Sequence, residues 1–500
     1  MNSKKKVFEN SFLYTFSKLL VKGISFLLLP IYTMYLTPED YGITNLAASF
    51  TQVATFIIAM SLHVAIIRFY AELKEDKMRL KRFYGTIITF ISISGLVFFI
   101  VSMLFKNFIV DLFFDGIPFF PYILLTIVTL TFYTLHTIHG RIIESMQQGK
   151  KLTIINLIVF GLQVSINIYL IVVLELGALG ILLGSFVVNL GYVIYMMIDL
   201  KRRDLIVFCV DLELLKESLS YSIPLMPHHL STSIATFASR VFINKSTTLA
   251  TVGLYSVAWQ FGGLIDIVQS SVHRAFTPWF YNLMNVRNEK NINEIKEFSY
   301  ILITLYSLMY VIIGLFSQEI IIFMTTSKYI MAWTAIPILV MAFSVKSIYY
   351  FYVSVLFYYK KASKKIFIAT LIGSFADIFL AFILVPILGM YGSAISFLLA
   401  KIIVVVIVVK MSIGYDNIGY KLFDMIKIIL SSFVFMVVGL YFSYTKFLLV
   451  FSWYNLGYKI LVLIIYILYI YIKNKSLINE YIKLIILKLQ ESNRDNKSNS

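Results

Sequence analysis

Long apolar segments alternate with short polar ones along nearly the whole chain. Runs such as 86–105, 366–385 and 392–409 hold at most one charge each and are long enough, at ~20 residues, to cross the hydrocarbon core of a bilayer. The pattern predicts about fourteen membrane-spanning helices. They fall near residues 12–35, 43–67, 84–105, 117–139, 153–174, 177–198, 220–243, 250–275, 298–316, 331–353, 366–385, 391–409, 425–444 and 452–472. The expected fold class is an all-α polytopic membrane protein.

The polar connecting segments support this count, because basic residues accumulate on the cytoplasmic side of membrane proteins. With the N-terminus inside, 31 of the 43 Lys and Arg residues fall in inner segments. Only four fall in outer segments: Lys106, Lys245, Lys328 and Lys446. The alternation continues to the last helix, so we expect both termini on the cytoplasmic side.

Composition excludes several classes of protein. The chain is 59% hydrophobic and 14% charged, whereas a soluble domain carries roughly 25% charged residues. The net charge of +17 comes largely from the short inner segments, which favours topology determinants over a nucleic-acid site. The single cysteine, Cys209, excludes an intrachain disulfide and a cysteine-based metal cluster.

Catalytic and nucleotide-binding motifs are missing from the sequence. It contains no Walker A sequence, no G-x-S-x-G, no H-E-x-x-H and no paired acidic metal motif. We therefore expect a transporter without a catalytic site, a bound metal or a cofactor. Transport coupled to protons or sodium ions, or driven by the substrate gradient, is favoured over ATP hydrolysis.

An internal repeat relates the first six predicted helices to the next six. An offset of 211 or 212 residues aligns Gly42 with Gly253, Phe69–Tyr70 with Phe280–Tyr281, and Leu176–Gly180 with Leu388–Gly392. Because six is even, the two repeats share one orientation, as in transporters whose halves are related by an axis along the membrane normal. Gly42 and Gly253 are expected where the chain turns back into the bilayer.

The repeat predicts a domain organisation. Residues 1–200 form an N-terminal six-helix lobe, 201–219 a cytoplasmic linker and 220–410 a second six-helix lobe. Two extra helices follow in 411–474, and 475–500 form a cytoplasmic tail.

The stretch "KLLVKGISFLLLPIYTMYLTPEDYGITNLAASF" (18–50) carries the pattern L-x-P-x-[ED]-Y-G after a first helix that contains Pro30. The positions of this pattern are Leu36, Pro38, Asp40, Tyr41 and Gly42. Together with "YSIPLMPHHLS" (221–231) and "VGLYSVAWQF" (252–261), it resembles the polysaccharide transporter (Wzx-like) branch of the multidrug/oligosaccharidyl-lipid/polysaccharide flippase superfamily.

This resemblance implies a flippase of the bacterial cytoplasmic membrane. Its substrate would be an oligosaccharide repeat unit linked to undecaprenyl pyrophosphate, destined for O-antigen, capsule or another surface polysaccharide. The repeat unit would pass from the inner to the outer leaflet by alternating access. Besides the glycolipid and the bilayer, a polysaccharide polymerase and a chain-length regulator are the implied partners.

Basic residues inside the predicted spans are candidates for holding the pyrophosphate, because a charge at membrane depth is costly and needs a partner. Five of them lie in helices 1, 2, 7 and 8, which line the cleft in the resembling family: Lys18, Lys22, Arg68, Arg240 and Arg274. They would bind phosphate through charge-assisted hydrogen bonds. The alternatives are snorkelling to lipid phosphate and, for Arg240, pairing with a helix carbonyl.

Four further ionisable residues in the spans are candidates for ion coupling or internal ion pairs. Asp266 and Asp377 lie at mid-span in helices 8 and 11, and His63 and His273 lie in helices 2 and 8. Either role would explain an ionisable side chain at this depth.

Three other functions compete with the flippase hypothesis. A peptidoglycan-precursor flippase shares the helix number and a cationic cleft, but the "PEDYG" stretch is closer to the polysaccharide branch. A multidrug or cation antiporter of the same superfamily would need carboxylates in the cleft, and helices 1 to 6 offer none at mid-depth. A polysaccharide polymerase would need a charged outer loop or domain, and the outer segments are short and nearly uncharged.

Overall fold

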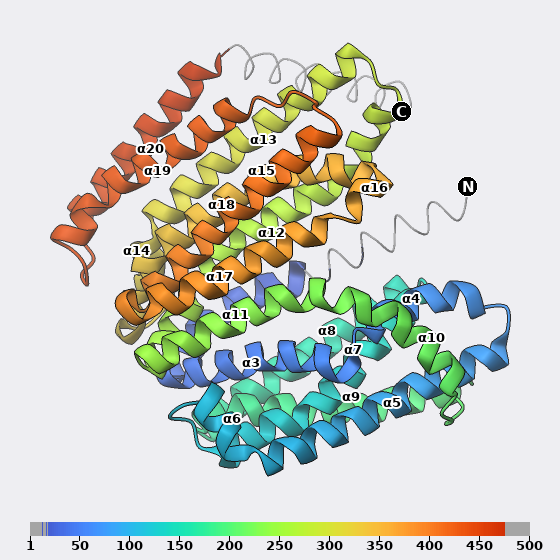
Figure 1. The fold of residues 1–500 in the computed structure, drawn as a ribbon. Coiled ribbons are helices and arrows are strands. Elements are labelled where there is room, and N and C mark those ends of the chain that lie inside the picture. Colours follow the sequence, from blue (N-terminus) through green and yellow to red (C-terminus); the bar gives the residue numbers. More distant parts are fainter. Residues whose placement is uncertain (1–12, 14–16, 18, 476–500) are drawn as a thin grey trace, which may run out of the picture.

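The computed structural model of the protein describes residues 13, 17 and 19–475. These residues form helices and connecting segments and contain no β-strand. Figure 1 shows two stacks of helices, the N-terminal half below and the C-terminal half above. Lys18 and the tail beyond residue 475 lie outside the described residues.

The N-terminal half begins with a helix over Leu19–Tyr35, whose last turns are α2 (Leu29–Tyr35). Its other helices are α3 (Pro38–Ala59), α4 (Leu62–Leu73), α5 (Lys77–Leu104), α6 (Lys106–Phe113), α7 (Leu124–Ser145), α8 (Gly149–Ile168) and α9 (Gly177–Arg202). Short π-helical turns at Phe119–Ile123 and Tyr169–Val173 adjoin α7 and α8. An extended segment then leads to α10 (Leu212–Ser222).

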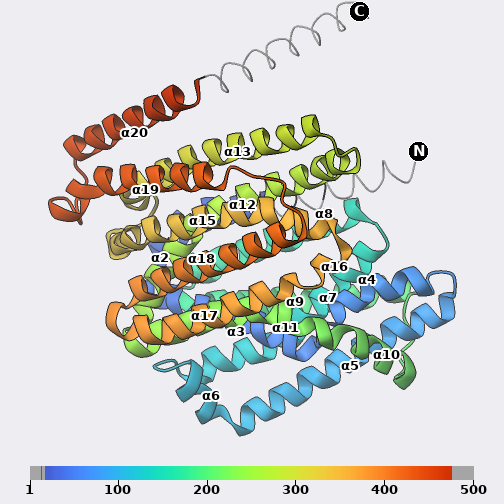
Figure 2. The ribbon, with the colours of Figure 1, turned by 45° about the horizontal axis from the view of Figure 1, so that its top comes forward.

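The C-terminal half contains ten α-helices within the described part of the chain. They are α11 (Met226–Ser246), α12 (Leu249–Asn285), α13 (Glu289–Leu315), α14 (Ser317–Met324), α15 (Ile336–Tyr358), α16 (Lys360–Ser363), α17 (Ile366–Leu388), α18 (Met390–Tyr415), α19 (Leu422–Thr445) and α20 (Trp453–Lys473). Two 3₁₀ segments, Ile223–Leu225 and Ser327–Ala335, precede α11 and α15. The helices α19 and α20 lie at the edge of this half, beside α13 (Figure 2).

Twelve helices of the described residues are long and apolar enough to cross a membrane. Two more helices occupy the predicted first and seventh positions. Leu19–Tyr35 is apolar but shorter, and α11 is more polar because it contains Ser, Thr, His, Arg and Lys residues. The predicted all-α membrane fold is confirmed, and the count of fourteen depends on including these two helices.

The predicted second helix, 43–67, is in fact two helices. It starts earlier, at Pro38, and is broken where Met60 and Ser61 adopt left-handed φ values of 44° and 58°. The corresponding helix of the second half, α12, is continuous over 37 residues. Neither Gly nor Pro stands at the break, so the sequence offered no signal for it.

The start of α3 explains part of the L-x-P-x-[ED]-Y-G pattern. Thr37 caps the helix, since its side chain accepts a hydrogen bond from the Asp40 amide at 3.1 Å and its own amide donates to the Asp40 carboxylate at 3.0 Å. Pro38 occupies the first helical turn, where no amide donor is needed. Asp40 also accepts a hydrogen bond from the amide of Ala178 at 3.0 Å, which fixes the start of α3 against the start of α9.

The predicted repeat is visible in the backbone conformation of Gly177 and Gly389. Gly177 is the first residue of α9 and Gly389 directly precedes α18, the sixth long helix of each half. Their φ values are left-handed, at 54° and 55°. A glycine adopts such values without the steric cost that other residues incur. Two residues 212 positions apart therefore share an unusual conformation, as a duplicated structural unit requires.

Gly42 and Gly253, in contrast, do not form turns, so the predicted reason for them was wrong. They lie within α3 and α12, and each faces the other helix. A Cβ added at either glycine would lie 2.9 Å from a backbone carbonyl carbon of the other helix, that of Leu249 or Pro38, and 3.2 Å from the amide nitrogen of the other glycine. We call this contact between the beginnings of α3 and α12 the glycine contact.

Other residues of the L-x-P-x-[ED]-Y-G pattern also contact the C-terminal half beside the glycine contact. The Tyr41 hydroxyl hydrogen-bonds the side chain of Gln260 across the two halves at 2.9 Å. The carbonyl of Leu36 accepts a hydrogen bond from Tyr329 at 3.1 Å, and the rings of Tyr41 and Tyr329 meet edge to face. The two halves are therefore joined tightly at the end of the bundle where α3 and α12 begin, which we call the closed end.

Candidate functional site

A cavity of about 510 Å³ lies between the two halves. The N-terminal half contributes residues of the first helix, α7, α8 and α9, and the C-terminal half contributes Ile267, Ser270 and Arg274 of α12. We call it the inter-half cavity. Its volume is within the range of small-molecule sites.

Two cations from different halves line the inter-half cavity. Lys22 comes from the first helix and Arg274 from α12, and both side chains are exposed. Arg274 is oriented by donating a hydrogen bond from Nη2 to the Ser271 hydroxyl at 3.0 Å. No Asp or Glu is among the described residues that line the cavity, so its electrostatic potential favours an anion.

Uncharged polar groups complete the lining. Asn156 and Gln163 of α8, Asn189 of α9 and His136 of α7 contribute amide and imidazole groups. Such groups both donate and accept hydrogen bonds, which suits a ligand rich in hydroxyl groups. None of these four residues is predictable as a site residue from the sequence, because an uncharged polar side chain in a span gives little signal when its neighbours are unknown.

Two of the other predicted cleft cations, Arg68 and Arg240, do not line the inter-half cavity. Lys18 is outside the described residues. Arg68 is exposed, forms an ion pair with Glu72 at 3.2 Å on its own helix and lies over the ring of Tyr221 at 4.6 Å. It is not among the residues that line the inter-half cavity. The pair with Glu72, one helical turn away, explains how its charge is accommodated.

Arg240 was also predicted to be a cleft cation, and the structure places it in a different hollow. Its side chain is 6% exposed and donates from Nη1 to the carbonyl of Thr236 at 3.1 Å. It shares a hollow of about 10 Å³ with Tyr255 and Asp377, inside the C-terminal half. Because α11 packs against both α3 and α17, a residue on it can face either half, and the sequence does not distinguish the two.

The two predicted acids lie inside the C-terminal half. Asp266 forms an ion pair with Lys346 at 2.7 Å and accepts a hydrogen bond from the Tyr350 hydroxyl at 2.8 Å. Lys346 and Lys401 line a separate cavity of about 320 Å³. Asp377 is 7% exposed, and its Oδ1 has no hydrogen-bond partner among the described residues. Neither acid lines the inter-half cavity.

The two predicted histidines pack against aromatic rings. The ring centroid of His63 lies 5.5 Å from that of Phe56, and that of His273 lies 4.8 Å from that of Tyr350. Neither histidine lines the inter-half cavity. Their role in ion coupling stays a prediction.

The histidine that does line the cavity, His136, is held by α9. Its Nδ1 is 3.0 Å from the side-chain oxygen of Asn189, and its ring stacks on Tyr192 with centroids 3.7 Å apart. These contacts fix the imidazole in one orientation at the cavity wall.

A charged cluster lies one helical turn further along α7. The fully buried His139 contacts the Tyr192 hydroxyl at 2.9 Å and Asp199 at 3.3 Å. Asp199 also pairs with Lys151 of α8 at 2.5 Å and with Arg203 at 3.5 Å. This single carboxylate therefore ties α7, α8 and α9 together.

We expect Asp199→Asn to destabilise the N-terminal half by about 1.5–3 kcal/mol, the range for hydrogen bonds to charged groups. The substitution keeps the shape of the side chain but removes the charge that Lys151 and Arg203 face. Thermal unfolding of the purified protein in detergent measures the effect. Glu144→Gln is the control, since its more exposed pair with Arg141 should contribute less than about 1 kcal/mol, and equal losses for the two variants would contradict the assignment.

The sequence of the chain matches that of a known protein family. Residues 7–284 match the polysaccharide biosynthesis protein family. A curated relative, Lsg locus putative protein 1 of Haemophilus influenzae, is 23% identical over 367 residues, which cover 71% of this chain and 86% of that protein.

Solved structures agree on the fold. The lipid II flippase MurJ in an inward closed conformation aligns with a TM-score of 0.67 at 21% identity, covering 94% of this chain and all of that one. An inward-facing multidrug resistance transporter of the MATE family aligns with a TM-score of 0.59 at 14% identity, covering 80% and 98%. The chain therefore belongs to the polysaccharide biosynthesis protein family and has the fold of the multidrug/oligosaccharidyl-lipid/polysaccharide flippase superfamily.

Proposed function

We propose that this protein is a flippase for oligosaccharide repeat units linked to undecaprenyl pyrophosphate. It would move them from the inner to the outer leaflet of the bacterial cytoplasmic membrane by alternating access. The observation that carries the proposal is the inter-half cavity, in which Lys22 and Arg274 face the same space from different halves.

The two cations suit a pyrophosphate better than a neutral or cationic ligand. Lys22 and Arg274 supply ammonium and guanidinium donors, and both bind phosphate oxygens through short, charge-assisted hydrogen bonds. No acid among the described lining residues competes for them. Because they belong to different halves, an anion held between them would respond to any movement of one half against the other.

The polar part of the wall suits the glycan. Asn156, Gln163 and Asn189 line the same cavity as the cations, and their amides are matched to the mixed donors and acceptors of sugar hydroxyls. A cationic drug would instead need carboxylates, and a multidrug antiporter is therefore the weaker proposal.

The closed end favours a cycle in which the two halves alternate. The glycine contact seals α3 against α12 at this end, while the basic connecting segments lie at the other. Basic segments face the cytoplasm in membrane proteins, so the described conformation would be closed to the outer side. Export of the glycan would require the glycine contact to open, which is the rocking motion of transporters with parallel repeats.

Lys22→Ala and Arg274→Ala should each reduce surface polysaccharide by about tenfold or more. The loss of one charge-assisted hydrogen bond costs about 1.5–3 kcal/mol, and 1.4 kcal/mol corresponds to a factor of ten. Surface polymer is measured by immunoblot in a host that depends on this flippase, together with the amount of protein in the membrane.

Arg68→Ala is the matched control, since Arg68 is a cation of the same predicted set that lies outside the cavity. It should leave surface polymer near the wild-type level. Wild-type polymer in the Lys22→Ala/Arg274→Ala double variant, with the protein present in the membrane, would refute the proposed function.

A further inference from the structure

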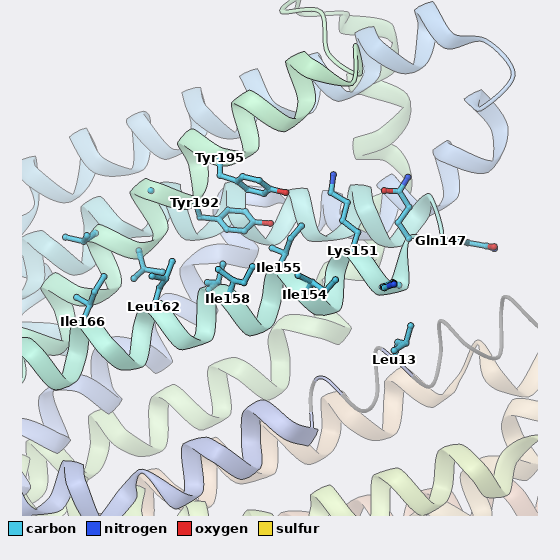
Figure 3. Close-up of a pocket in the computed structure, with 17 residues that line it drawn as sticks. Leu13, Gln147, Lys151, Ile154, Ile155, Ile158, Leu162, Ile166, Tyr192 and Tyr195 are labelled. Carbon is cyan, nitrogen blue, oxygen red and sulfur yellow. The ribbon is translucent and has the colours of Figure 1, made fainter.

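A long apolar groove runs along the N-terminal half between α8 and α9. Its volume is about 1210 Å³. Figure 3 shows Ile154, Ile158, Leu162 and Ile166 of α8 in a row along it, with Tyr192 and Tyr195 of α9 on the other side. We call it the α8–α9 groove.

The helix that forms the groove is poorly covered by protein. Only 17% of the most apolar window of α8 is buried, the lowest share among the twelve candidate spans of the described residues. Ile154, Ile158 and Leu162 are 47%, 57% and 52% exposed. From Lys151 to Ile166 the groove follows the helix for about 22 Å at 1.5 Å per residue, which is longer than one leaflet of about 15 Å. An extended hydrocarbon chain therefore fits it better than a compact ligand.

The two ends of the groove differ chemically. Lys150 and Lys151, with Gln147 and Gln148, line its end at the start of α8. Lys151 is fixed by its ion pair with Asp199 at 2.5 Å. Anionic lipid head groups gather at such a cationic surface, so this end is the side from which a lipid with an anionic head group would enter the groove.

The groove adjoins the inter-half cavity. Val159 of α8 and Val188 of α9 line both spaces, so the two spaces are neighbours at these residues. Lys22 and Arg274 stand in the cavity beyond them. A lipid chain in the groove can thus remain in an apolar environment while its head group reaches the cations.

We propose that the α8–α9 groove holds the polyprenyl chain of the lipid carrier while the pyrophosphate occupies the inter-half cavity. This assignment rests on the proposed function and adds the site of the lipid chain to it. An ordinary phospholipid could fill the same apolar surface. The shared border at Val159 and Val188 favours the carrier. Only a lipid whose head group enters the cavity can bind Lys22 and Arg274 while its chain lies in the groove.

Gly191→Leu tests the groove without disturbing the core. Gly191 lines the groove, and a Cβ added there meets no atom within 4 Å, so the leucine should project into the groove and the protein should fold. Transport measured as surface polymer should fall at least fivefold. Gly161→Leu is the matched control, since Gly161 of α8 is equally open but lines neither space, and it should leave transport unchanged.

Photocrosslinking identifies the occupant. The protein is placed in phosphatidylglycerol nanodiscs that contain undecaprenyl pyrophosphate, with p-benzoylphenylalanine in place of Leu162 or of Leu96, an exposed residue of α5. At Leu162 the adduct with undecaprenyl pyrophosphate should exceed its mole fraction by about tenfold, a preference of about 1.4 kcal/mol. At Leu96 adducts should follow the lipid composition.

Two outcomes would overturn the assignment, and they differ from failure of the proposed function. Adducts at Leu162 that follow the lipid composition, or full transport by Gly191→Leu, would show that the groove holds bulk lipid. Undecaprenyl pyrophosphate binding is measured separately by native mass spectrometry. Binding that depends on Lys22 and Arg274 without enrichment at Leu162 would reject the groove alone, whereas no binding at all would reject the function as well.

Discussion

Gly253→Ala should open the closed end and stop transport. An added Cβ would lie 2.9 Å from the carbonyl carbon of Pro38 and closer still to its oxygen, and backbone atoms cannot rotate away as a flexible side chain can. Overpacking of this kind costs about 1–3 kcal/mol. The substitution would raise the free energy of the conformation in which α3 touches α12 by about 1–3 kcal/mol relative to a conformation in which the two helices are apart. The population ratio of the two conformations would then shift by about 5- to 150-fold towards the open one.

Spin labels on α3 and α12 report this change as a distance distribution in the purified protein. The wild type should show a short distance at the closed end, and Gly253→Ala a longer one. Gly263→Ala on the same helix is the control, because a Cβ there meets no atom within 4 Å. Identical distributions in Gly253→Ala and wild type, with normal surface polymer, would mean that the glycine contact does not control the cycle.

Lys459→Met should be the most destabilising single change at the edge of the C-terminal half. The Lys459 side chain is fully buried in α20 and lies 2.7 and 2.8 Å from the two carboxylate oxygens of Glu319 on α14. Gln318 provides a third contact at 3.2 Å. Removal of one partner from a buried ion pair costs about 3–5 kcal/mol, because the other charge remains without compensation.

Thermal unfolding in detergent tests this loss against two comparisons. Adding Glu319→Gln to Lys459→Met should restore most of the stability, since two neutral groups of similar volume then replace the pair. Lys427→Met breaks only the exposed pair with Asp424 at 3.6 Å and should change the stability by less than about 1 kcal/mol. A double variant no more stable than Lys459→Met would contradict the ion-pair explanation.

Two of the five predicted cleft cations, Lys22 and Arg274, line the inter-half cavity. That they bind the substrate stays a prediction. Arg240 lies on α11, which packs against helices of both halves, so its depth in the membrane was predictable but its direction was not. Arg68 follows the break at Met60 and Ser61, where the helix changes course without a Gly or Pro to indicate it.

The sequence by itself determined the membrane class, the approximate position of most spans and the duplication. Each of these depends on local hydrophobicity or on a fixed spacing along the chain, and both can be read without knowing any contact. The tertiary structure alone decided that Gly42 and Gly253 meet each other, that Asp266 pairs with Lys346, and that the α8–α9 groove borders the inter-half cavity. In a bilayer nearly every face of a helix is apolar, so hydrophobicity does not reveal which face meets protein and which meets lipid. Only packing between residues distant in the sequence determines that.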